Sequence, residues 1–204
     1  MLGFQPAAFH CLMDIGCGQG MALPVLADRF KLQRMIAVDV DPRLVQLASR
    51  KARNVPCPLQ AITGSVLALD LPDNSIDGIF CHQLLHHVAQ QERALSELYR
   101  VLTPGGYLLL SESCESFINS WTVRWLFRHP PNVQRSARDY VQLVRDAGFS
   151  VADQQIREYS PWWSLRDLGI MRRMGRVRPE PPPTEVLMVA RKLTNEQHLH
   201  PPAT

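Results

Sequence analysis

Apolar and polar residues follow two different patterns along the first half of the chain. Short apolar runs predict strands, at residues 11–15, 35–39, 59–66, 76–81 and 106–111. Between them, stretches with helical apolar spacing predict helices, at residues 21–30, 43–53 and 90–102. Because strands that alternate with helices form parallel sheets with helices on both faces, we expect an α/β fold.

The last third of the chain is organised differently. It predicts a helix at 136–147 and strands at 149–159 and 185–192, separated by two inserts at about 114–132 and 160–184. All four tryptophans fall in the inserts, at Trp121, Trp125, Trp162 and Trp163. We expect one domain over residues 1–193 and a flexible C-terminal tail at 194–204.

Composition and charge exclude several classes of protein. The 204 residues are 46% hydrophobic and 20% charged, which is typical of a folded globular protein. A net charge of +3 is too small to favour nucleic acid or a membrane surface as a partner. No apolar run is long enough to span a bilayer, so we expect a cytoplasmic protein. Five cysteines without a C-x-x-C pair indicate reduced thiols.

A glycine-rich turn follows the first predicted strand. Gly16, Gly18 and Gly20 would let a nucleotide-like cofactor approach the backbone, because glycine has no β-carbon and tolerates positive φ. Met21 stands where the dinucleotide fingerprint requires its third glycine, which disfavours NAD and FAD. Asp39 ends the second strand, where a carboxylate can accept hydrogen bonds from a ribose diol. The predicted ligand is therefore an adenosine cofactor.

The segments 12–20 and 38–39 resemble motif I and its successor in class I S-adenosylmethionine-dependent methyltransferases. The segments 71–77, 85–88 and 97–106 are similar to three later motifs of the family, so the resemblance covers about residues 11–113. It implies a doubly wound, Rossmann-like sheet of seven strands, mostly parallel with an antiparallel last strand. It also implies transfer of a methyl group from S-adenosyl-L-methionine, with S-adenosyl-L-homocysteine as the product.

The resemblance also implies which residues bind the cofactor. Asp14 and the glycines would face its methionine part, Asp39 its ribose and Val40 its adenine. Ser65 departs from the family pattern, because a carboxylate is common at that position. The full implied set is Asp14, Gly16, Cys17, Gly18, Gly20, Asp39, Val40, Ser65, Val66, Cys81 and His82.

Three histidines after the fourth strand are the candidate general bases: His82, His86 and His87. On a helix, adjacent His86 and His87 would diverge by about 100°, so one of them is expected to be structural. His82 and His86 have the spacing of a metal pair without an evident third ligand, so no metal is expected. Glu112 ends the fifth strand and is interpreted either as a substrate contact or as a solvated carboxylate.

The expected acceptor is a small molecule, apolar or aromatic if the inserts form its pocket. Residues 80–83 lack the Asn-Pro-Pro-aromatic pattern of base-amine methyltransferases, which argues against nucleic acid. About ten residues precede the first strand, where relatives have helices that cover the site. Either the start has been trimmed, or the inserts or a second subunit, as in a homodimer, cover it. The alternative is a non-catalytic binding or partner subunit that needs another chain to complete its site.

Overall fold

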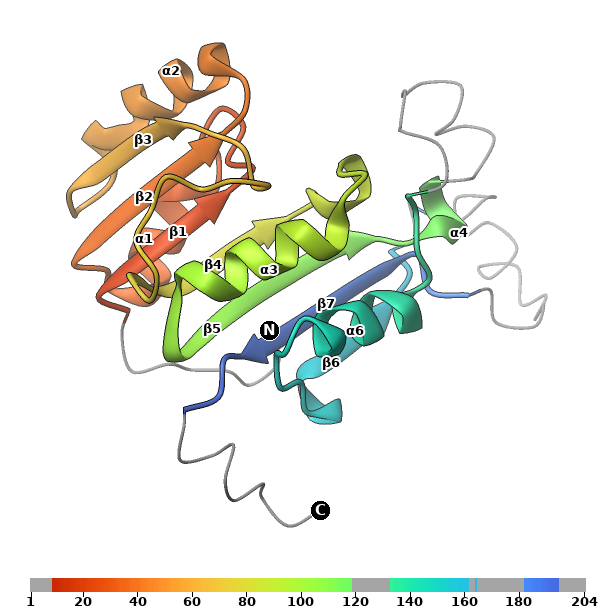
Figure 1. Cartoon of the computed structure of the whole chain (residues 1–204). Helices are drawn as coiled ribbons and strands as arrows, with labels where there is room; N and C mark the ends of the chain where they lie inside the picture. Colours follow the sequence, from red (N-terminus) through yellow and green to blue (C-terminus); the bar gives the residue numbers. More distant parts are fainter. Residues whose placement is uncertain (1–8, 119–132, 162–163, 165–181, 195–204) are drawn as a thin grey trace.

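The computed structural model describes residues 9–118, 133–161, 164 and 182–194. Within these residues, seven strands form one sheet in the order β3-β2-β1-β4-β5-β7-β6 (Figure 1). The strands are β1 (Cys11–Ile15), β2 (Arg34–Asp39), β3 (Leu59–Thr63), β4 (Ile76–His82), β5 (Leu102–Ser113), β6 (Ile156–Tyr159) and β7 (Glu185–Arg191). The first five are parallel, and β7 pairs antiparallel with both β5 and β6. The expected sheet is confirmed.

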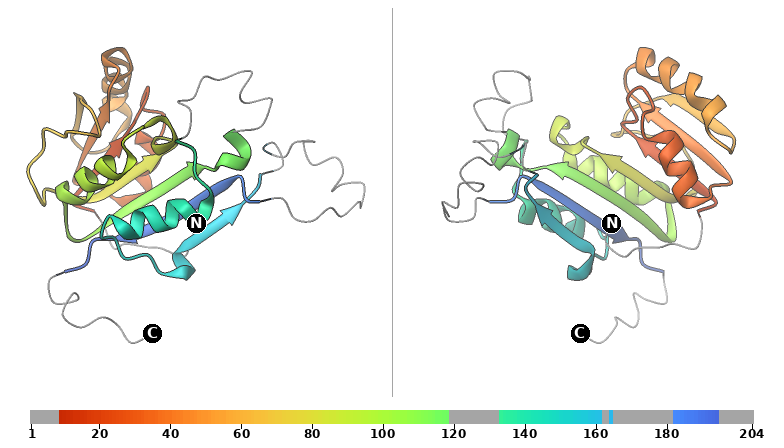
Figure 2. Two further views of the ribbon diagram at one scale, coloured as in Figure 1. Left: turned by 45° about the vertical axis from the view of Figure 1, so that its right-hand side comes forward. Right: turned by 180° about the vertical axis from the view of Figure 1, so that it is seen from behind.

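Helices cover both faces of the sheet, as the views from two sides show (Figure 2). The described helices are α1 (Leu23–Phe30), α2 (Pro42–Arg50), α3 (Gln91–Val101), α4 (Glu115–Ile118) and α6 (Ala137–Asp146), with short 3-10 turns η1 (Lys51–Asn54), η2 (Leu85–His87) and η3 (Asp153–Gln155). Alternate residues of a strand point to opposite faces, so Leu12 packs with α1 and α2. Met13 packs on the other face, with α3 and α6. The sheet therefore separates two apolar cores.

The start of α2 follows from its sequence. Asp41 is the N-cap, and its carboxylate accepts a hydrogen bond from the Arg43 amide at 2.9 Å. Pro42 occupies the first turn, where its missing N–H has no cost. The helix cap is Asp41 and not Asp39, which leaves Asp39 available for other contacts.

The predicted strand at 149–159 is wrong over most of its length, because β6 covers only its last four residues. The Arg145 guanidinium of α6 donates to the Val151 carbonyl at 3.0 Å and to the Asp153 carboxylate at 2.9 Å. The 3-10 turn η3 then occupies residues 153–155. A carbonyl bound to an arginine and a helical turn both interrupt a strand ladder.

The strand predicted at 106–111 is longer than expected. Strand β5 already begins at Leu102, so the Thr-Pro-Gly-Gly segment at 103–106, whose composition is typical of a turn, lies inside the strand. The pairing of β4 with β5 shifts register there, between Ile76 and Gly78. Gly105 has φ +84°, a conformation that other residues rarely adopt. Residues 103–106 are therefore an irregular part of one continuous strand, similar to a β-bulge.

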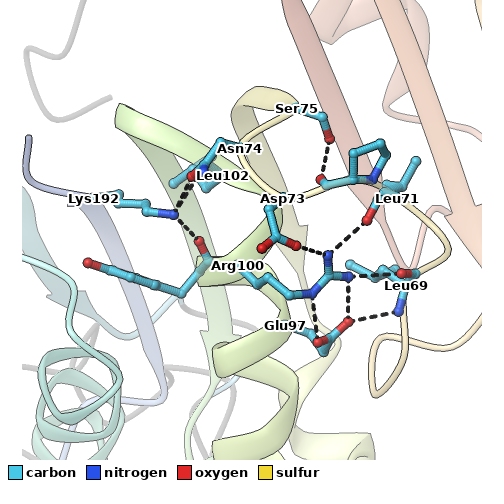
Figure 3. Close-up of polar contacts among 11 residues, drawn as sticks. Leu69, Leu71, Asp73, Asn74, Ser75, Glu97, Arg100, Leu102 and Lys192 are labelled. Carbon is cyan, nitrogen blue, oxygen red and sulfur yellow. Dashed lines mark hydrogen bonds and ion pairs between the residues drawn. The ribbon is translucent and has the colours of Figure 1, made fainter.

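Arg100 fastens the loop before β4 to α3 (Figure 3). Its guanidinium donates to the carbonyls of Leu69 and Leu71, both at 2.9 Å, and to the carboxylates of Asp73 at 2.6 Å and Glu97 at 2.9 Å. A planar guanidinium can satisfy several acceptors at once. This joins two segments that resemble the family, 71–77 and 97–106, at the amino end of β4. We call it the Arg100 staple.

Several sequence predictions fall largely outside the described residues. They concern the tryptophans of both inserts and the tail after Thr194. Within the described parts of the chain, no helix is long and apolar enough to cross a membrane.

Candidate functional site

The direction of the strand order reverses between β1 and β4. From β1 the chain proceeds outward through β2 and β3, and then returns to the other side of β1 with β4 and β5. In open parallel sheets, ligands bind in the crevice at the carboxyl ends of the strands beside such a reversal. Asp14 and Gly16 lie at this end of β1, Asp39 at the end of β2 and His82 at the end of β4. The topology therefore gathers the predicted site residues at one edge.

The glycine turn is bound to β2. The amides of Gly16 and Cys17 both donate to the Val38 carbonyl, at 2.8 and 3.0 Å. The Gly18 amide donates to the Asp39 carboxylate at 2.8 Å. Gly18 has φ +53°, and a β-carbon built there would meet nothing within 4 Å. Hydrogen bonds to β2 therefore hold the turn in place. The space beside Gly18 is open, so a ligand can approach the backbone there.

Asp39 connects the glycine turn to the start of α2. One carboxylate oxygen accepts from Gly18 and the other from the Asp41 amide at 2.9 Å. Each carboxylate oxygen can accept a second hydrogen bond. The neighbouring Val40 side chain is 72% exposed, an unusual position for a large apolar group. A carboxylate beside an exposed apolar side chain fits a ribose with its attached base.

Asp14 is the second carboxyl group at this edge. Its side chain is buried, and its Oδ2 atom has no hydrogen-bond partner among the described residues. Burial, with a smaller contribution from the charge of Asp39, raises the pKa of Asp14 to about 7. Buried carboxyl oxygens almost always have donors, so this one fits a bound group that donates or is cationic. The ammonium group of a methionine moiety has both properties.

The other predicted cofactor residues are less accessible. The hydroxyl of Ser65 accepts from the Leu67 amide at 3.2 Å, and Val66 is buried. Cys81 is fully buried in the core, so its side chain is directed away from any ligand and only its backbone remains for contact. Burial raises the pKa of the Cys17 thiol to about 12, which keeps it protonated at neutral pH.

The three candidate histidines have different surroundings. His82 is exposed and stacks on Phe80, with ring centroids 5.8 Å apart. His87 is also exposed, whereas His86 is buried. The rings of His86 and His87 lie 4.1 Å apart, so in the 3-10 turn η2 they diverge less than helical geometry would require. Of the three candidate histidines, only His86 is buried.

Both interpretations of Glu112 are wrong, because this side chain is completely buried. One of its oxygens accepts from the amides of Leu84 and Leu85, at 2.8 and 2.7 Å. The other lies 2.7 Å from Nδ1 of His86. The only sequence signal was an acidic residue at the end of an apolar strand. Its partners are 26 to 28 positions away in the sequence, so the pattern could not reveal them.

Glu185 on β7 is a further buried carboxyl group that the sequence did not single out. It accepts hydrogen bonds from the Gln83 side-chain amide and the Ser113 hydroxyl, both at 2.9 Å. Burial raises the pKa of Glu185. Gln83 itself has φ +55°, rare for a residue with a side chain. These contacts fasten the segment after β4 to the far side of β5.

The described residues hold one further groove and no metal-type cluster. No cluster of three or more His, Cys, Asp or Glu side chains within them is arranged to hold a metal ion. A groove of about 440 Å³ lies between α3 and α6, and its lining includes Glu92, Arg135 and Asp139. None of the predicted site residues lines this groove. The candidate site is therefore the crevice at the carboxyl ends of β1, β2 and β4.

The sheet order and the covering helices define a doubly wound α/β protein, whose candidate site is the edge at the carboxyl ends of β1, β2 and β4. Comparison with known proteins specifies the class further. A model of the methyltransferase domain matches residues 13–110. A probable S-adenosylmethionine-dependent methyltransferase of Mycolicibacterium smegmatis is 29% identical over 162 residues, which cover 74% of this chain and 57% of that protein. Residues 13–110, just under half of the chain, therefore match a methyltransferase domain, the class of protein that the motifs of this sequence resemble.

One further sequence relative and one solved structure are also similar to this chain. The demethylmenaquinone methyltransferase of Thermus thermophilus is 32% identical over 101 residues, which cover 50% of this chain and 46% of that protein. The structure of a complex between the Haloferax volcanii Trm112 methyltransferase activator and a methyltransferase contains a similar fold, with a TM-score of 0.73 at 22% identity. The match covers 95% of this chain and 87% of the chain in that structure. At 22% identity, this structural similarity shows a shared fold alone. The chain spans about half or less of the length of the first curated relatives that it matches.

Proposed function

We propose that this protein transfers a methyl group from S-adenosyl-L-methionine to a small-molecule acceptor. The observation that carries the proposal is the pair of carboxyl groups beside the glycine turn. Asp39 has acceptor capacity for a ribose diol, and buried Asp14 has an oxygen without a donor. They lie on the neighbouring strands β1 and β2, so one ligand that carries a ribose and an ammonium group can contact both.

When bound, S-adenosyl-L-methionine supplies an electrophilic methyl group on a positively charged sulfur. Since a thioether leaves readily, most of the acceleration can come from alignment and exclusion of water. The chain's own residues then have three tasks. The glycine turn and Asp39 hold the nucleoside, Asp14 holds the methionine end, and a histidine after β4 takes the proton that the acceptor loses.

The small-molecule acceptor is supported by two observations. Residues 80–83 read Phe-Cys-His-Gln, without the pattern of base-amine methyltransferases. The Thermus thermophilus relative is named for a small-molecule substrate, demethylmenaquinone. An apolar or aromatic acceptor would match the aromatic residues of the inserts.

Titration calorimetry with S-adenosyl-L-homocysteine tests the cofactor site without knowledge of the acceptor. We expect one-to-one binding of this ligand and no saturable binding of NADH. Asp39→Ala should raise the dissociation constant about 10- to 100-fold, because it removes a charged acceptor from both the ligand and the glycine turn.

Asp41→Ala is the matched control. It removes a neighbouring carboxylate that caps α2 and should lower stability slightly, with little change in affinity. Equal affinities of wild type and Asp39→Ala would contradict this placement of the cofactor.

The alternative is a subunit that needs another chain to complete its site. The relevant observation is the Haloferax volcanii structure of the same fold, which is a complex with a methyltransferase activator. Size-exclusion chromatography combined with an activity assay separates the two possibilities. A monomer that methylates an acceptor by itself would exclude the alternative.

A further inference from the structure

The segment after β3 lies beside the carboxylate that is proposed to bind the ribose. In the parallel pairing of β2 with β3, Asp39 is opposite Thr63. The amide of the next residue, Gly64, donates to the Asp39 carbonyl at 2.9 Å. Ser65 therefore stands one residue beyond a backbone contact with Asp39. It follows the carboxyl end of β3, which belongs to the same edge of the sheet as the candidate site.

The strand order indicates the direction in which the base of a bound nucleoside extends. Asp14 is on β1 and Asp39 on β2, and β3 lies on the far side of β2 (Figure 1). A ligand whose methionine end reaches Asp14 and whose ribose contacts Asp39 therefore carries its base outward, toward β3. The exposed side chain of Val40, directly after Asp39, is an apolar surface on which such a base can pack.

The hydroxyl of Ser65 has hydrogen-bonding capacity left for a ligand. Its oxygen accepts from the Leu67 amide at 3.2 Å, which uses one of its two lone pairs. Within the residues that the structure describes, no acceptor binds the proton of this hydroxyl. The side chain is half-buried, and the Ala68 amide closes the turn by donating to the Ser65 carbonyl at 3.1 Å. Toward a ligand, the hydroxyl can therefore act as a donor or as an acceptor.

A hydroxyl and a carboxylate select different bases at this position. A carboxylate only accepts hydrogen bonds, so it requires a donor such as the 6-amino group of adenine and repels an acceptor there. A hydroxyl rotates its proton to suit either partner. Polar groups that lose their partner on binding weaken the complex, and binding sites discriminate between similar ligands in this way. The neutral hydroxyl of Ser65 removes that discrimination.

We propose that Ser65 is the specificity-determining residue for the base of the cofactor, and that its hydroxyl makes the site tolerant of purines without a donor at position 6. The proposal rests on the cofactor site proposed above. The ligand class is then broader than adenosine, because it includes 5′-thio purine nucleosides with an ether oxygen in place of the amino group. The Ser65 hydroxyl donates to that oxygen, whereas it accepts from the amino group of adenine.

Titration calorimetry with two ligands tests this assignment: S-adenosyl-L-homocysteine and its analogue with a 6-methoxy group in place of the 6-amino group. The analogue replaces a donor with an acceptor and leaves the ring nitrogens of the base unprotonated, as in adenine. The wild type should bind both ligands with dissociation constants within about tenfold of each other. Ser65→Asp should bind the analogue at least about 30-fold more weakly than S-adenosyl-L-homocysteine. Ser65→Ala should weaken the binding of both ligands by about 3- to 10-fold.

Ser75→Asp is the matched control. Ser75 is also half-buried, and its hydroxyl donates to the Pro72 carbonyl at 2.7 Å, at the amino end of β4. This variant adds the same charge at the opposite edge of the sheet, so it should bind both ligands as the wild type does. A wild type that binds the methoxy analogue more than about tenfold more weakly than S-adenosyl-L-homocysteine would overturn the proposal. Unchanged affinities in Ser65→Ala, or an unchanged ratio in folded Ser65→Asp, would also overturn it, because Ser65 would then not contact the base.

The two proposals fail in different ways. If the wild type binds neither ligand, the proposed cofactor site fails, and the role of Ser65 fails with it. If the wild type binds S-adenosyl-L-homocysteine and rejects the methoxy analogue, the methyltransferase function stands and the role of Ser65 falls.

Discussion

At the scale of single residues, Asp14 should couple cofactor binding to pH. Burial raises the pKa of its carboxyl group from 3.8 to about 7 in the folded protein. A bound ammonium group favours the ionised carboxylate, so binding below pH 7 requires release of a proton. The affinity for S-adenosyl-L-homocysteine should therefore rise from pH 5.5 to about 7.5 and level off above.

Calorimetry in two buffers with different ionisation enthalpies measures this proton release. Up to about one proton per ligand should be released at pH 6, and almost none at pH 8.5. Asp14→Asn is the control, because it cannot ionise. In that variant, binding should be weaker at pH 8 and nearly independent of pH. A wild-type affinity that falls as the pH rises through 7 would have the wrong sign for this mechanism.

The residues of the site differ in how far the sequence revealed them. The glycine turn with Gly18 and the strand end at Asp39 are short local patterns, so the sequence indicated both, and the family resemblance implied Asp14. Glu112 and Glu185 act through partners far away in the sequence. Their burial depends on how β5 and β7 pack under the loop after β4, and no local pattern contains that information.

At the scale of elements, the Arg100 staple should contribute to stability without affecting the cofactor. Arg100→Ala removes hydrogen bonds to two backbone carbonyls and two carboxylates. We expect the free energy of unfolding to fall by about 1–3 kcal/mol, measured by urea denaturation. The staple lies at the amino end of β4, opposite the candidate site. The dissociation constant of S-adenosyl-L-homocysteine should therefore change less than twofold.

Arg43→Ala is the matched control for the staple. Arg43 pairs with Asp41 at the exposed start of α2, and pairs of this kind contribute little to stability. If both variants unfold at the same urea concentration as the wild type, the staple is not a stabilising element.

Elements with strong periodic patterns were predicted well, and those that depend on tertiary contacts were not. Helix α6 follows from its amphipathic pattern and from Ser136, which caps it. The error at 149–159 arises from Arg145, whose contact with Val151 interrupts a segment of strand-like composition. The extension of β5 through Gly105 required a register shift against β4. In both cases a partner from another element decided the backbone conformation.

At the scale of the whole molecule, the candidate site occupies one edge of the sheet and the Arg100 staple the other. Ligand binding stabilises the folded state by mass action, by about 2.7 kcal/mol at a concentration 100 times the dissociation constant. For a chain of this length, S-adenosyl-L-homocysteine at that concentration should raise the melting temperature by about 5–10 °C. NADH at the same concentration should leave the melting temperature unchanged.

Hydrogen exchange shows where that stabilisation acts. We expect amides of the glycine turn and of the segment after β2 to open locally when the site is empty, so the ligand should slow their exchange most. Amides that open only in global unfolding, such as those of buried β4, should be slowed by the global stabilisation alone. We expect the loop fastened by the Arg100 staple to open locally at the other end of the sheet, so its exchange should not change. Equal protection of that loop and the glycine turn would mean that the ligand binds elsewhere or tightens the whole sheet, and the site at the β1–β4 reversal would have to be abandoned.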